Sequence, residues 1–100
     1  MGTKPRFRPE RLAEKLAHIR KSLGLSQSQL VRLLDLDNLD NCRISEYERD
    51  IREPSLITLL AYSYLVGITI NDMVDDSVDL PEQIKLKQRR KHITLPGSYW

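Results

Sequence analysis

The stretch SQSQLVRLLDLDNLDNCRISEYERDIREPSLITLLAYSYLV, residues 26–66, contains the signals for three helices in close succession. Ser26 is a favourable N-cap, and the leucines that follow it form one buried side of the first of these helices. The run DLDNLDN, residues 35–41, is rich in residues that favour turns and caps. We therefore expect a connection there, with the next helix beginning somewhere in the range Leu39 to Asn41.

The second and third of these helices have a clear inner side and clear ends. Ile44 and Tyr47 recur at helical spacing and are expected in the core, although the Tyr47 hydroxyl could reach a phosphate from the edge. Pro54 ends that helix. Ser55 caps the following one, LITLLAYSYLV, which is apolar almost all round and is predicted to be the central core helix, ended by Gly67.

Two more helices flank this segment. An apolar stripe at spacings of four and three residues predicts a helix over residues 9–23, ended by Gly24 in the left-handed conformation. Thr69 is expected to cap a short fifth helix. Five helices with short turns and no strand pattern predict an all-α bundle, with the packed domain covering residues 9–77.

The formal charge of +2 conceals an uneven distribution. Residues 1–11 carry a net +3, residues 12–81 a net −5, and residues 82–100 a net +4. We therefore expect an acidic body with a basic N-terminal arm, residues 1–8, and a basic C-terminal tail, residues 78–100, both flexible. Basic arms of this kind favour polyanionic partners.

Several classes of protein are disfavoured. The single cysteine, Cys42, cannot form an internal disulfide, which favours a reducing compartment, and we expect a cytoplasmic location. The apolar stretch of residues 56–70 is too short and too polar to span a bilayer. His18, His92 and Cys42 lack metal-ligand spacing, and no catalytic constellation is present. The sequence therefore predicts no enzyme, no metal and no cofactor.

Two segments carry a family resemblance. IRKSLGLSQSQLVRLL, residues 19–34, and ISEYERDIREPSLITLLAYSYLVGITINDMV, residues 44–74, resemble the lambda-repressor-like helix-turn-helix family, which includes Xre, phage repressors and Cro. The resemblance implies that the second helix meets the DNA backbone, with Gln27 binding phosphate, and that the third helix enters the major groove. It also implies a structural ion pair between Arg20 and Glu48.

A helical wheel of the third helix, with Ile44 inward, turns Cys42, Glu46 and Arg49 outward. Asn can pair with adenine, Arg with guanine and Glu with cytosine, and a cysteine can pack near a thymine methyl. The candidate base-reading residues are Asn41, Cys42, Arg43 and Glu46. The candidate phosphate-binding residues are Ser26, Gln27, Ser45, Arg49, Arg52, Lys4, Arg6 and Arg8.

The sequence thus predicts a DNA-binding transcriptional regulator, a repressor by resemblance, that acts as a homodimer on double-stranded DNA. Residues 26–53 carry four basic and seven acidic side chains, which leaves open a protein-interaction module of the same fold without DNA binding. A further alternative is the DNA-binding antitoxin of a toxin pair, whose tail after Pro81 wraps a small protein partner.

Overall fold

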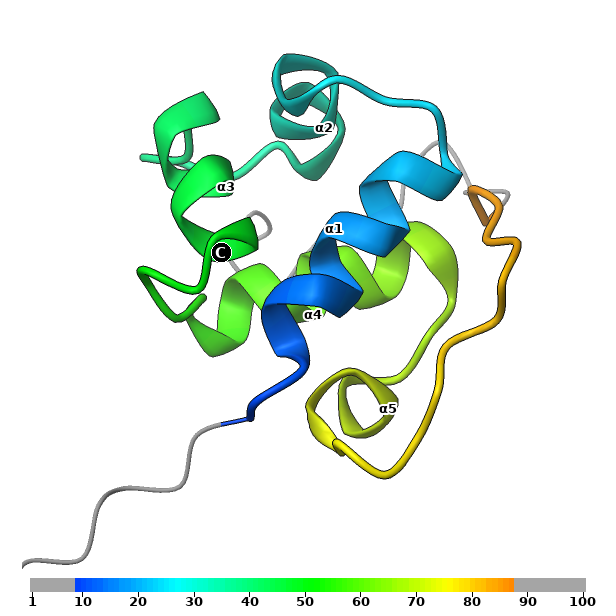
Figure 1. The fold of residues 1–100 in the computed structure, drawn as a ribbon. Helices are drawn as coiled ribbons and strands as arrows, with labels where there is room; N and C mark the ends of the chain where they lie inside the picture. The colour runs from blue at the N-terminus through cyan, green and yellow to red at the C-terminus, as the bar shows by residue number, and fades with distance from the viewer. Residues whose placement is uncertain (1–8, 88–100) are drawn as a thin grey trace, which may run out of the picture.

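Five helices follow one another along residues 9–87, the part of the chain that this computed structural model describes (Figure 1). No strand occurs within those residues. The predicted all-α class with five helices is therefore confirmed, whereas residues 1–8 of the expected arm and residues 88–100 of the expected tail lie outside the described range. The helices are α1 (Leu12–Ser22), α2 (Gln27–Leu34), α3 (Asn41–Glu48), α4 (Leu56–Val66) and α5 (Ile70–Val74).

Four helices begin at a side-chain cap. Ser26, Asp40, Ser55 and Thr69 each accept a hydrogen bond from the backbone N–H three residues further on. The predicted caps at Ser26, Ser55 and Thr69 are confirmed, and α3 begins inside the predicted window. Gln29 also accepts a bond from the Ser26 amide, which completes a capping box at the start of α2.

The start of α1 differs from the prediction. The helix begins at Leu12 and not at Pro9, and the side chain of its N-cap, Arg11, makes no capping bond. The free amides are satisfied from a distant segment: the Asp76 carboxylate accepts bonds from Glu10 N at 3.0 Å and Arg11 N at 2.9 Å. These bonds lower the pKa of Asp76 below its usual value.

Aspartates with left-handed backbone follow the last residues of α2 and α3. Asp35 has φ 52° and closes α2 through its amide, which donates to the Val31 carbonyl, and Asp50 has φ 60° just after α3. Aspartate tolerates this region better than most side chains, although glycine is usual there. Both helices are thereby limited to eight residues.

The core gathers around α4. Helix α1 packs against α3 and α5, while α4 packs against α2 and α5. In Figure 1, α4 passes behind α1, with α2 and α3 toward one side and α5 toward the other. Tyr62 and Leu65 of α4 are buried together with Leu16, Ile19 and Ile44 from the helices around them. Within residues 9–87, no helix is both long and apolar enough to cross a membrane.

The packed chain continues past residue 77, which the sequence predicts as the end of the domain. Ile84 is 5% exposed and belongs to the core. Around it, the His18 ring Nε2 lies 2.8 Å from the Pro81 carbonyl oxygen, and the Lys87 amide donates to the Leu65 carbonyl at 2.9 Å. The described part of the predicted flexible tail is therefore held against α1 and α4.

Lys15 of α1 forms hydrogen bonds with α5 and with the residue that follows it. Its side chain is buried, and its ammonium donates to the carbonyl oxygens of Asp72 and Asp75, at 2.7 Å each. Carbonyls at the C-terminal end of a helix lack helical partners and favour a positive charge. The lysine therefore supplies the positive charge that the last turn of this five-residue helix lacks in its own sequence.

We predict that Asp76→Asn lowers the melting temperature at neutral pH, because the amide cannot replace a carboxylate that accepts two bonds at the start of α1. The pKa of Asp76 is lower in the folded protein than in the unfolded chain. The stabilisation is therefore fully present above the unfolded pKa of about 3.9, and it is lost as the pH falls through the lower folded pKa. Thermal unfolding followed by circular dichroism should show that the melting temperatures of the wild-type protein and Asp76→Asn become equal below about pH 4. Asp37→Asn, at an exposed position, is the matched control; an equal effect there at neutral pH would contradict the capping role.

Candidate nucleic-acid interface

The starts of α2 and α3 lie side by side on the surface. The Asn41 side-chain Nδ2 donates to Ser28 Oγ at 2.6 Å, and both residues are exposed. The first turn of each helix carries backbone N–H groups without helical partners, and the helix dipole adds partial positive charge there. The starts of two helices are thus brought to one patch, which we call the helix-start patch and define by Gln27, Ser28 and Asn41.

A partly buried ion pair supports this patch from beneath. Arg20 on α1 binds both carboxylate oxygens of Glu48 on α3, with Nε to Oε2 at 2.7 Å and Nη2 to Oε1 at 2.9 Å. Arg20 also donates to the Leu25 carbonyl at 2.8 Å, and the Gln27 side chain lies 3.5 Å from Glu48 Oε1. The Glu48 carboxylate raises the pKa of Arg20. The pair expected from the resemblance is therefore present, and it ties α1, α2 and α3 together.

On the opposite side of α3, Glu46 joins two arginines. Its Oε1 lies 2.9 Å from Arg52 Nε and 3.9 Å from Arg43 Nε. The two guanidinium groups therefore share one carboxylate, and the cluster keeps one uncompensated positive charge. The Glu46 side chain is 30% exposed, so its carboxylate is engaged with arginine while still accessible to solvent.

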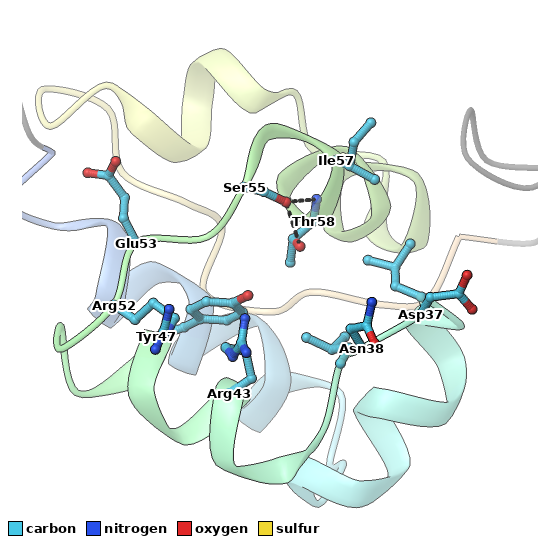
Figure 2. A pocket seen from close by; sticks show the side chains of 11 residues that line it. Asp37, Asn38, Arg43, Tyr47, Arg52, Glu53, Ser55, Ile57 and Thr58 are labelled. Carbon is cyan, nitrogen blue, oxygen red and sulfur yellow. Dashed lines mark hydrogen bonds between the residues drawn. The ribbon is translucent and has the colours of Figure 1, made fainter.

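This arginine cluster borders a hollow between α3 and the start of α4 (Figure 2). The hollow has a volume of about 470 Å³ and is walled by the connections before and after α3 and by the first turn of α4. Tyr47, which we expected in the core, is indeed 4% exposed, yet it also lines this hollow.

The predicted base-reading residues are thus divided between two sides of α3. Asn41 belongs to the helix-start patch, Cys42 is exposed, and Arg43 and Glu46 lie beside the hollow. Sequence reasoning missed Ser28, because a wheel drawn for one helix contains no information about its neighbour. It also missed the hollow, although Pro54 followed by the Ser55 cap signalled that a helix start would come soon after α3.

The predicted phosphate-binding residues are also dispersed. Ser26 Oγ is used for the cap of α2, and Gln27 lies against Glu48. Ser45 Oγ accepts a bond from Arg49 Nε at 3.1 Å on the outer side of α3, and Arg52 is held by Glu46. Lys4, Arg6 and Arg8 lie outside the described residues.

The described residues were also compared with the requirements of a metal site. Across residues 9–87, no group of three or more histidine, cysteine or acidic side chains is arranged to hold a metal ion. Comparisons of the chain with models of protein families, with curated proteins and with solved structures gave no match. Functional inference therefore depends on the geometry of the helix-start patch, the arginine cluster and the hollow.

We predict that Arg20→Met destabilises the protein by about 3–5 kcal/mol, because it leaves the Glu48 carboxylate, whose side chain is 8% exposed, without its partner. Glu48→Met should destabilise the protein less, since the Arg20 side chain is 15% exposed and keeps its hydrogen bond to the Leu25 carbonyl. The double variant should be more stable than Arg20→Met alone. Urea unfolding of all four proteins measures this cycle, and strictly additive losses would show that the two side chains do not interact.

Proposed function

We propose that this protein is a sequence-specific DNA-binding transcriptional regulator that reads the major groove with α3 and acts as a homodimer. In this proposal α2 and α3 form a helix-turn-helix of the lambda-repressor-like kind, and binding at a promoter represses transcription. The observation that carries the proposal is the helix-start patch, where the exposed ends of two short helices meet through the bond between Asn41 and Ser28.

The dimensions of α3 suit a DNA groove. A helix of eight residues is about 12 Å long, similar to the width of the major groove of B-form DNA. Asn41 and Cys42 in its first turn are exposed, and Arg49 is exposed at its far end. With α3 in the groove, the adjacent start of α2 would face the phosphate backbone, where amide donors and the helix dipole favour an anion.

The charge distribution assigns a separate role to the ends of the chain. Residues 9–87 contain ten basic and fourteen acidic side chains, a net charge of −4, whereas the remaining residues contain six basic and no acidic ones. Phosphate attraction dominates the affinity of most DNA-binding proteins. We therefore infer that the described body supplies shape and base contacts, and that residues outside it supply much of the electrostatic attraction.

The same net charge of −4 favours one alternative, a protein-interaction module that uses these surfaces without DNA. The decisive experiment is selection of bound fragments from a random pool of double-stranded DNA with the full chain at physiological salt. A discrete motif with two half-sites about 34 Å apart would support a dimeric DNA-binding protein. Recovery of no enriched sequence would reject the proposal in favour of the alternative.

We predict that Asn41→Ala weakens binding to the selected DNA by about 1–3 kcal/mol and relaxes preference at one base position, because it removes an amide that can bond a base edge. Replacing Lys4, Arg6 and Arg8 by glutamine should instead weaken binding to all sequences alike and flatten the salt dependence by about one unit for each phosphate that is no longer bound. Fluorescence anisotropy at several salt concentrations measures both effects. Arg32→Gln, on the exposed side of α2, is the control that shows the effect of removing one positive charge elsewhere on the surface. Equal losses on specific and random DNA for Asn41→Ala would exclude base reading by this residue.

A further inference from the structure

The hollow beside α3 has the size and lining of a small-molecule site. Its volume of about 470 Å³ falls within the range of about 300–1,000 Å³ that is common for ligand pockets. Leu36, Leu39 and Ile57 contribute apolar side chains to its lining, while Arg43 and Arg52 contribute cationic groups. A ligand with one anionic end and one apolar end would match both kinds of side chain.

The first turn of α4 adds donors to the polar end of the hollow. Ser55 Oγ accepts from the Thr58 amide at 3.1 Å and lies 3.0 Å from Thr58 Oγ1, as the dashed lines of Figure 2 mark. The cap satisfies the Thr58 amide, whereas the amides of Leu56 and Ile57, in the same first turn, have no helical partner. The dipole of this eleven-residue helix adds partial positive charge at that end.

Tyr47 places a hydroxyl group at the hollow. The residue is 4% exposed, and its hydroxyl makes no hydrogen bond to another of residues 9–87. Figure 2 shows the hydroxyl directed into the hollow. It is not among the fully buried polar atoms that lack a partner, so it is open to solvent and can donate to an anionic oxygen in the hollow.

The two acidic side chains that line the hollow do not point into it. Asp37 and Glu53 line it, but Figure 2 shows both carboxylates directed away from its interior. Glu46 is engaged by the two arginines and neutralises only one of them. The remaining positive charge lies at the same edge as the Tyr47 hydroxyl.

We propose that this hollow binds a small organic anion, with its carboxylate or phosphate between Arg43, Tyr47 and the start of α4, and its apolar body against Leu36, Leu39 and Ile57. The site is complete within the body of the chain and needs no DNA. A second consequence rests on the proposed function: because Arg43 is also a candidate base-reading residue, a ligand that holds its guanidinium in the hollow reduces DNA affinity.

The test uses the full chain labelled with ¹⁵N, with benzoate, phenyl phosphate and the neutral analogue benzamide as probes at constant ionic strength. We expect saturable shifts of the amides of residues 36–39 and 55–58 with at least one of the two anions, and much weaker binding of benzamide. Comparing benzoate with phenyl phosphate distinguishes a carboxylate from a phosphate ligand. Absence of saturable shifts at these residues with both anions would overturn the proposal.

Three variants make the test specific. Tyr47→Phe removes only the hydroxyl, and Arg43→Gln removes the charge at the rim; each should weaken binding of the anion by about tenfold. Arg32→Gln, an exposed arginine of α2 outside the hollow, should leave it unchanged. Well-dispersed spectra establish that each variant is folded. Equal losses for Arg43→Gln and Arg32→Gln would indicate attraction to net charge alone and reject the site.

The coupling to DNA is tested separately, with a DNA sequence obtained by selection. Saturating the hollow with the anion should weaken DNA binding by the wild-type protein by several-fold and leave the Arg43→Gln variant insensitive. Unchanged DNA affinity would reject the coupling through Arg43 while leaving the binding site established by the spectra. Failure of the DNA selection would reject the proposed function without affecting the spectroscopic result.

Discussion

The arrangement of this protein depends on the ion pair between Arg20 and Glu48. It joins the middle of the bundle, on α1, to the last turn of α3, and the same arginine holds the carbonyl of Leu25 just before α2. Because both partners are largely withdrawn from water, the pair is costly to break on one side only. The relative placement of three helices is thereby fixed, and with it the meeting of the starts of α2 and α3.

A second set of polar bonds closes the bundle at its other end. Asp76 caps α1 from a distance, Lys15 caps α5 from within α1, and Ile84 then covers the core between them. These contacts join residues more than fifty positions apart in the chain, so the segment after α5 is part of the folded unit. Small helices such as α5, with five residues, are stable only with tertiary support of this kind.

Helix α3 has two polar sides, and each borders a different part of the molecule. One side, with Asn41, lies next to the start of α2, whereas the other, with Arg43 and Glu46, borders the hollow beneath α4. In our proposals the first side serves DNA and the second serves a small anion, with Arg43 between them. A single short helix would then connect an effector site to a recognition surface.

The sequence by itself determined the local structure. Ser26, Ser55 and Thr69 marked three helix starts, the leucine and isoleucine spacing marked the buried sides, and DLDNLDN marked the turn before α3, because caps and periodicity act over a few residues. Only the tertiary structure decided that α1 starts at Leu12, with the Asp76 carboxylate bonded to the amides before it. It also decided that Ile84 completes the core and that Asn41 bonds Ser28. It also decided that Tyr47 opens onto a hollow formed by three separate segments. Each of these contacts joins residues from different elements, and the local sequence pattern does not specify which surfaces will meet.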